Sequence, residues 1–446
     1  MIIDHLSTFP HGGAGTAARR LHERLVERGV CSRFNYWKDE SDQQLDASFR
    51  QLNLEREDNS LPILKPISRK LEKRRRRMIC EQYDRHVANR PEEYELYSIP
   101  WTLEKSALEL AELGSDIIHL HWMAFFIDYP SFFRSIPDST PIVWSLHDMN
   151  PLTGGCHYSS GCSRFTVGCG NCPQLHDPQA RDASYHGFRA KQHALRRKQI
   201  HVVTPNKWLS DLAQHSAIFP DQTWFSVIRL GLDEHLFRPV DQRTARAELG
   251  LPEDVPVVAF GADDIENHRK GFHHLLDALR NVQQKTDVQC LVFGRGNLPK
   301  DRTGLPRFHE FGFVDSPRQH RLIYSAADVF VLPSREDNQP QTGLESMACE
   351  TPVVGFRAGG IPEYVRHKQT GLLAAMGDDG EMADCILRLL KDPAWSQQLG
   401  RAGRQMIEQE FTADLQARSY VELYRELANV STPLELPNPR NLPAAA

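Results

Sequence analysis

Three carboxylates that could bind hydroxyl groups lie close together in the C-terminal half of the chain. They fall within ten residues of one another and are followed by an apolar run and a glycine pair: Glu336, Asp337, Glu345, 352–356, Gly359 and Gly360. A carboxylate can accept paired hydrogen bonds from adjacent sugar hydroxyls, and glycine lets backbone N–H groups come close to an anion. The segment therefore predicts a site that binds hydroxyls and a phosphate together.

Histidines stand on two strand-like runs in the N-terminal half. His147 ends the run 141–147, and the carboxyl edge of a parallel sheet is where α/β proteins bind ligands. His119 and His121 alternate along one run, so their side chains share a face. We expect these two histidines to pack against the floor of a cleft.

A glycine-rich turn follows the first strand-like run. Gly12 and Gly13 lie between the run 2–7 and a helical segment, where a phosphate or a sugar can approach the backbone. The full G-x-G-x-x-G pattern is absent, so a nicotinamide cofactor is not indicated.

Four of the nine cysteines are closely spaced. Cys156, Cys162, Cys169 and Cys172 form the pattern C-x5-C-x6-C-x2-C, in which the second half has good zinc spacing. Three states remain open, namely a structural zinc site, two disulfides or unlinked thiols. We expect the other five cysteines to be small buried apolar residues.

Short β-branched runs alternate with helical segments along most of the chain. The runs that read as strands are 2–7, 31–37, 116–122, 141–147 and 200–205, followed by 255–262, 288–296, 328–333 and 351–356. This alternation predicts an α/β fold with parallel sheets that helices cover on both faces.

A length of 446 residues argues for two domains rather than one core. We expect a first domain over 1–210, with an insertion at about 38–100 that breaks the alternation, and a second domain over 225–411. A helix over 412–431 is expected to pack back toward the first domain. The Pro-rich tail 432–446 is predicted to be disordered.

Composition excludes several classes of protein. Apolar residues make up 40% and charged residues 25% of the chain, which is typical of a water-soluble globular protein. The formal net charge of -5 gives no general attraction to nucleic acid or to anionic membranes. We expect no signal peptide and no membrane helix, and we therefore expect a cytoplasmic protein with mostly reduced cysteines.

One basic run departs from this balance. Residues 69–77 read RKLEKRRRR and fit either a solvated helix face or a patch that docks on anionic lipid at the inner membrane face. Nucleic-acid binding is disfavoured because no platform of stacking aromatic residues accompanies the charges.

The segment 333–354, PSREDNQPQTGLESMACETPVV, resembles the E-x7-E region of retaining nucleotide-sugar glycosyltransferases of family 4. It is most similar to the exopolysaccharide branch, which carries EDN-x-P here and also the four-cysteine motif. The resemblance covers most of the chain outside 38–100 and the tail. It implies a GT-B fold, in which two Rossmann-like domains face each other across a cleft. The donor would bind mainly in the C-terminal domain and the acceptor in the N-terminal one.

The resemblance also assigns candidate roles to single residues. Glu345 would bind the ribose of the donor, and either Asp337 or Glu336 would contact the transferred sugar. Lys270, with Arg269 as the nearest substitute for the family arginine, would stabilise the diphosphate. The remaining candidates are donor-binding positions and a histidine directed at the sugar: Gly359, Gly360, Gly13, Asn338 and His147.

Together these residues imply an enzyme that transfers a sugar from a UDP- or GDP-sugar to a hydroxyl of a glycan or lipid-linked acceptor, with retention. The chain has no Asp-x-Asp motif, and we expect catalysis without a divalent metal, with zinc as the one candidate cofactor in a structural role. Two alternatives stay open, a sugar-nucleotide epimerase or hydrolase on the same fold and a zinc-stabilised adaptor without enzymatic activity.

Overall fold

The computed structural model of the chain describes residues 1–39, 45–52, 90–91, 93–102 and 114–428, together with five single positions between 74 and 87. The predicted tail 432–446 lies outside these residues. So does most of the basic run 69–77, of which only Arg74 and Arg77 are described, both exposed.

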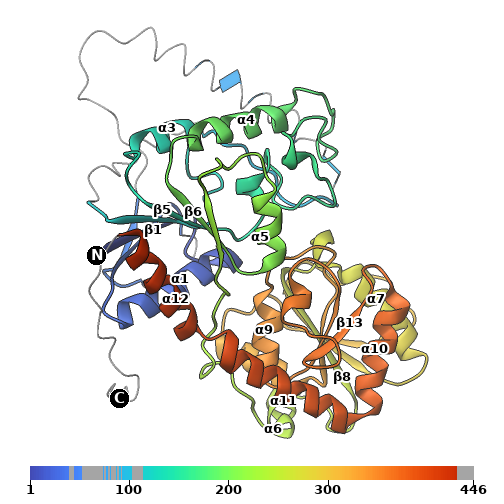
Figure 1. The fold of residues 1–446 in the computed structure, drawn as a ribbon. Coiled ribbons are helices and arrows are strands. Elements are labelled where there is room, and N and C mark those ends of the chain that lie inside the picture. Colours follow the sequence, from blue (N-terminus) through green and yellow to red (C-terminus); the bar gives the residue numbers. More distant parts are fainter. Residues whose placement is uncertain are drawn as a thin grey trace, which may run out of the picture.

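The first domain is built on a parallel sheet of seven strands in the order β3-β2-β1-β4-β5-β6-β7 (Figure 1). Their bounds are β1 Ile2–Ser7, β2 Cys31–Tyr36, β3 Phe49–Gln51, β4 Ile117–Leu120, β5 Ile142–Ser145, β6 Ile200–Thr204 and β7 Trp224–Val227. Because β7 pairs with β6 in this sheet, the first domain continues beyond the predicted boundary at residue 210. The short β3 lies inside the predicted insertion and forms the opposite edge.

The second domain contains a parallel sheet of six strands in the order β10-β9-β8-β11-β12-β13. Their bounds are β8 Val257–Asp264, β9 Gln289–Arg295, β10 Arg307–Glu310, β11 Val329–Leu332, β12 Val353–Phe356 and β13 Gly371–Ala374. Strand order reverses direction between β8 and β11 here, and between β1 and β4 in the first sheet. Ligands of open α/β sheets bind outside the carboxyl ends of strands at such a point.

Helices cover both sheets. They are α1 Gly12–Glu27, α3 Tyr129–Ser135, α4 Ala183–Leu195, α5 Lys207–Gln214, α6 Gln242–Leu249, α7 Phe272–Gln283, α8 Pro317–Ala326, α9 Gln341–Ala348, α10 Asp379–Lys391, α11 Pro393–Glu410 and α12 Ala413–Leu427. Many begin at a polar side chain that accepts a hydrogen bond from a first-turn N–H, as Asp182 does for α4 and Asn206 for α5. None of the helices among the described residues combines the length and the apolarity that a membrane span requires.

The second domain has an apolar core on each face of its sheet, because successive side chains of a strand alternate between the two faces. Val257 and Ala259 of β8 belong to one buried apolar cluster of the second domain, whereas Val258 and Phe260 belong to another on the opposite face of the sheet. Successive side chains of a strand point to opposite faces. A strand that is apolar at every position is therefore buried on both sides.

The chain crosses between the domains at two places that lie side by side. Leu232 N–H donates to Phe411 O, and Ala413 N–H donates to Leu232 O, each at 2.9 Å. A Cβ on Gly231 would lie 2.5 Å from Thr412 O, so this close approach requires glycine. After the second crossing, α12 packs against α1 of the first domain (Figure 1).

Candidate active site

The candidate site lies where loops after the carboxyl ends of strands from both domains contact each other. Asn338 follows β11, and its Nδ2 donates to the backbone oxygen of His147, which follows β5, at 3.1 Å. Asn206, at the end of β6, donates from Nδ2 to Asn338 O at 3.0 Å. Asn338, predicted as a donor ligand, therefore also joins the two domains.

Asp337 is buried and forms the centre of a charged group with two half-buried cations. Lys270 Nζ lies 2.7 Å and Arg269 Nη1 3.2 Å from Asp337 Oδ2, and the carboxylate also accepts from Ser334 Oγ at 3.2 Å. Burial alone would raise the pKa of Asp337, but Lys270 and Arg269 outweigh it and lower the pKa to about 2. The carboxylate is therefore ionised at neutral pH and fixed against its two cations.

Arg269 is the more enclosed of the two cations. Its guanidinium donates to Glu95 Oε2 and to Glu336 O, each at 3.0 Å, and lies 4.0 Å from the ring centre of Tyr158. Its side chain is 12% exposed, against 22% for Lys270. Lys270 is thus the cation with more room to meet a ligand, and Arg269 connects the loop after β8 to the first domain.

Glu336 faces away from this group toward the first domain. It accepts from Ser160 N–H at 2.9 Å and from Ser159 Oγ at 3.3 Å. Burial raises the pKa of Glu336, with opposition from these hydrogen bonds and from Arg269. The two neighbouring acids therefore have different surroundings, which the sequence alone could not separate.

Glu345 lies on α9 and is buried, with an exposed fraction of 5%. Its Oε2 accepts from Tyr324 OH at 3.0 Å, and its Oε1 accepts from Arg20 at 3.0 Å. Arg20 comes from α1 of the first domain and also donates to Gln341 Oε1 at 3.1 Å. No sequence motif marked Arg20, because its role depends on the packing of one domain on the other.

The glycine pair packs directly on the loop that carries Asp337. Gly359 has φ +56°, and a Cβ there would lie 1.8 Å from Asp337 O, while one on Gly360 would lie 2.2 Å from Asn338 O. Gly360 N–H donates to Asp337 O at 2.9 Å. This amide is therefore used within the protein, and the pair holds the acidic loop in place.

Gly13 lies in the first turn of α1, where no side chain caps the helix. A Cβ there would meet nothing within 4 Å, whereas one on Gly15 would lie 2.6 Å from Phe9 O. The close approach in this turn thus requires Gly15, and Gly13 leaves open space at the helix N-terminus.

His147 belongs to a chain of imidazoles. Its Nε2 lies 3.3 Å from His121 Nδ1, and His121 Nε2 lies 2.9 Å from His5 Nδ1. Burial lowers the pKa of His147 to about 4, against an opposing effect of Asp148. His147 is therefore a neutral imidazole at pH 7, and His121 contacts it directly in addition to packing under it.

His119 extends this group toward α12. Its Nδ1 lies 2.6 Å from Tyr424 OH and its Nε2 2.7 Å from Ser145 Oγ. Within the described residues, His5, His119 and His121 are the group of three whose ligand nitrogens all lie within 4.8 Å of one another. Both nitrogens of His119 and of His121 have protein partners, whereas His5 Nε2 is buried without a hydrogen-bond partner. We therefore assign His119 and His121 to the hydrogen-bonded core.

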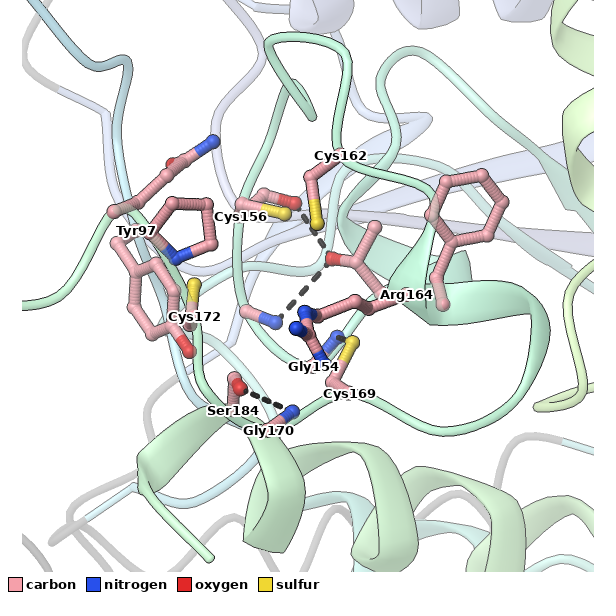
Figure 2. Close-up of a pocket in the computed structure, with 14 residues that line it drawn as sticks. Tyr97, Gly154, Cys156, Cys162, Arg164, Cys169, Gly170, Cys172 and Ser184 are labelled. Atoms are coloured by element: carbon pink, nitrogen blue, oxygen red, sulfur yellow. Dashed lines mark hydrogen bonds between the residues drawn. The ribbon is translucent and has the colours of Figure 1, made fainter. Parts of the chain in front are cut away.

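All four closely spaced cysteines line one pocket beside the site (Figure 2). The loop that carries them also supplies Tyr158, Ser159 and Ser160, which contact Arg269 and Glu336. Burial raises the pKa of Cys169 and of Cys172 to about 11.

Part of the second domain matches a known family. Residues 256–392 match the family model described as Glycosyl transferases group 1. Alpha-maltose-1-phosphate synthase of Mycobacterium tuberculosis (strain ATCC 25618 / H37Rv) is 33% identical over 233 residues, which are 46% of this chain and 58% of that protein. N-acetyl-alpha-D-glucosaminyl L-malate synthase of Bacillus anthracis is 26% identical over 247 residues, 53% of this chain and 59% of that protein. The chain thus spans a little under three fifths of the length of these curated relatives.

Solved structures resemble the whole chain. Sucrose-phosphate synthase from Thermosynechococcus elongatus has a TM-score of 0.66 at 21% identity and covers 97% of this chain and 100% of its own. Anabaena HepE in complex with UDP-glucose has a TM-score of 0.62 at 17% identity and covers 96% of this chain and 100% of its own. These likenesses confirm the predicted architecture. The chain has the GT-B fold, with two Rossmann-like domains, and residues 256–392 of its second domain are similar to the Glycosyl transferases group 1 family model.

Proposed function

We propose that this protein transfers a sugar from a nucleotide-sugar donor to a hydroxyl of a glycan or lipid-linked acceptor, with retention at the anomeric carbon. The observation that carries this proposal is the ion pair of buried Asp337 with half-buried Lys270 in loops at the carboxyl edge of the second sheet, together with buried Glu345 on α9, which pairs with Arg20 of the first domain. These side chains offer carboxylates for hydroxyls and a cation for a diphosphate.

Each residue of the group suits one part of the donor. Lys270 Nζ would stabilise the negative charge that develops on the diphosphate as the glycosidic bond breaks, because a fixed cation needs no reorganisation at that moment. Glu345 would accept hydrogen bonds from the ribose hydroxyls, in exchange for part of its bonding to Arg20 and Tyr324. Asp337, next to Lys270, would contact the transferred sugar.

The proposed transfer needs no reactant besides the nucleotide-sugar donor and the acceptor hydroxyl. The bond between the anomeric carbon and the diphosphate oxygen breaks, and the acceptor oxygen forms its new bond on the same face of the sugar. The acceptor proton passes to the departing diphosphate oxygen, which leaves a glycoside and a nucleoside diphosphate. Because Lys270 and helix N-termini can carry the phosphate charge, we propose that transfer needs no divalent metal.

His147 would face the sugar from the first domain. Its backbone oxygen is held by Asn338 of the second domain, and its ring is held by His121. A neutral imidazole can donate one hydrogen bond and accept another, so His147 suits a sugar hydroxyl better than a phosphate.

The basic run 69–77 bears on where the protein acts in the cell. We propose that it acts in the synthesis of a cell-surface or exopolysaccharide, in the cytoplasm, with the run 69–77 in contact with the anionic inner face of the membrane. A neighbour with the same fold, WaaG, is a glycosyltransferase involved in lipopolysaccharide biosynthesis, with a TM-score of 0.60 at 14% identity.

Substitution at the donor site tests the proposal. We expect Lys270→Ala and Glu345→Ala to abolish release of nucleoside diphosphate from the donor, while circular dichroism shows an intact fold. Lys285→Ala is the matched control, because Lys285 is exposed and pairs only weakly, at 3.5 Å, with Asp384. Undiminished activity in both site variants would refute the site.

A further inference from the structure

The pocket beside the candidate site has an unusual lining. Cys156, Cys162, Cys169 and Cys172 all border it, and Figure 2 shows their sulfurs around the same space, next to Tyr97 and Gly154. No carboxylate or imidazole is among its lining residues. Four soft sulfur donors without hard oxygen ligands favour zinc or iron over magnesium or calcium.

The cysteine loop has little regular structure of its own. Between the turn that ends at Leu152 and the start of α4 at Ala183, the single helical element is the three-residue turn Arg164–Thr166. Loops of more than about 15 residues without internal structure are uncommon in compact domains. Part of this loop is nevertheless buried, because Cys172 and Leu175 pack with Tyr97 in a small apolar cluster. A covalent or metal crosslink would explain why so long a segment holds one conformation.

The backbone of this loop is bent to present its sulfurs. Three cysteines are each preceded by a residue with positive φ: Gly161 at +84°, Gly168 at +122° and Asn171 at +46°. Gly154 N–H also donates to Cys169 Sγ at 3.3 Å, a contact that stabilises a thiolate more than a thiol. The left-handed residues turn the chain sharply just before Cys162, Cys169 and Cys172.

Positive charge lies next to the pocket. Lys191 of α4 is fully buried, and its Nζ donates to Asn150 O at 2.5 Å and to Thr153 O at 3.1 Å, so it lies over the start of the loop. Arg164 lines the pocket itself. Four thiolates around one zinc ion carry a net charge of about 2−, which these two cations would offset.

We infer that Cys156, Cys162, Cys169 and Cys172 bind one zinc ion as four thiolates. Binding would release the four thiol protons to solvent. Within the described residues, no three of the four sulfurs lie within 4.8 Å of one another. Binding would therefore require the cysteine side chains, and the loop that carries them, to come closer together than they are in this structure.

The zinc would order the surface that the first domain presents to the donor site. Tyr158, which covers Arg269, and Ser160, which binds Glu336, lie between Cys156 and Cys162. Fixing these two cysteines fixes the segment between them. This consequence rests on the proposed function, whereas the presence of the ion does not.

Metal content tests the inference directly. We expect the full chain, purified under reducing conditions, to contain about one zinc per molecule by inductively coupled plasma mass spectrometry. Cys162→Ser should lose most of the zinc. Cys31→Ser is the matched control and should keep the ion, because Cys31, which was expected from the sequence to be buried, is instead an exposed thiol on β2.

Thiol labelling of the unmodified chain gives a second result that does not depend on whether Cys162→Ser folds. The four cysteines should resist N-ethylmaleimide in the native protein and react once a chelator removes the metal, as mass spectrometry of peptides can show. Four thiols that react freely without chelator, disulfides among these cysteines, or iron in place of zinc would each overturn the inference. None of these readouts uses a donor or an acceptor, so failure of the zinc site is distinguishable from failure of the proposed transfer.

Discussion

At the scale of single residues, the two neighbouring acids Glu336 and Asp337 have separate environments. Asp337 lies against Lys270 and Arg269, whereas Glu336 binds Ser160 of the first domain. We therefore propose Asp337 as the carboxylate beside the transferred sugar, and Lys270, the more exposed of the two cations, as the one that meets the diphosphate.

The first prediction compares these two acids. Asp337→Asn should lower turnover by on the order of 100-fold, since it removes a fixed charge from the site. Glu336→Gln should cost less than about 10-fold, because an amide oxygen can still accept from Ser160 N–H. Steady-state kinetics with the donor measures both. Equal losses, or a larger loss for Glu336→Gln, would assign the sugar contact differently.

Asp337→Asn should also lower the stability of the fold. The folded pKa of Asp337 is about 2, below its ordinary value of 3.8, so the ionised group stabilises the fold above about pH 4. This contribution, about 2 kcal/mol, is lost as the pH falls toward 2. Urea unfolding of Asp337→Asn at neutral pH should show at least this loss.

At the scale of elements, the strands could be predicted from sequence and the contacts among their polar residues could not. The apolar runs near 255–262 and 328–333 became β8 and β11, because parallel strands buried on both faces need continuous apolar side chains. The register that places His5 opposite His119 depends on the pairing of β1 with β4, two strands separated by about a hundred residues. Nothing local in either run encodes that pairing.

The histidine cluster predicts how stability depends on pH. Burial lowers the pKa of His5, His119 and His121 well below 6.5, and that of His147 to about 4. Between about pH 6.5 and 4 the unfolded chain binds protons that the folded chain does not. The free energy of unfolding should therefore fall as the pH is lowered, by up to about 1.4 kcal/mol per pH unit for each imidazole.

Urea unfolding at about pH 7.5 and about pH 5.5 measures this dependence. His119→Gln should reduce the change of the unfolding free energy with pH by the contribution of one buried imidazole. His235→Gln, at a side chain that is 87% exposed, should leave the slope unchanged. Equal unfolding free energies of the unmodified protein at the two pH values would contradict the buried neutral histidines.

At the scale of the whole molecule, the domains are joined through the residues proposed to bind the donor. Arg20 reaches Glu345, Glu95 reaches Arg269, and both oxygens of Glu363 accept from the first backbone N–H groups of α5 at 2.9 Å. Because the donor would meet several of these groups, its binding and the arrangement of the domains are coupled.

Much of this architecture could be read from the sequence. The two-domain GT-B fold followed from alternating elements and from the resemblance around Glu345. Arg20, Glu95 and the serines that bind Glu336 were missed, because contacts between domains leave no spacing pattern in one chain. The predicted end of the first domain at residue 210 was too early, since β7 looked like the start of the second domain and pairs instead with β6.

The most direct test of the central claim is a screen of UDP-, GDP- and ADP-sugars by native mass spectrometry, with product analysis by NMR. We predict that the protein binds at least one of them and slowly releases nucleoside diphosphate together with a free sugar. The sugar should first appear in the anomeric configuration of the donor. Absence of binding to every nucleotide sugar, an epimerised but intact donor, or initial release of the opposite anomer would contradict a retaining glycosyltransferase.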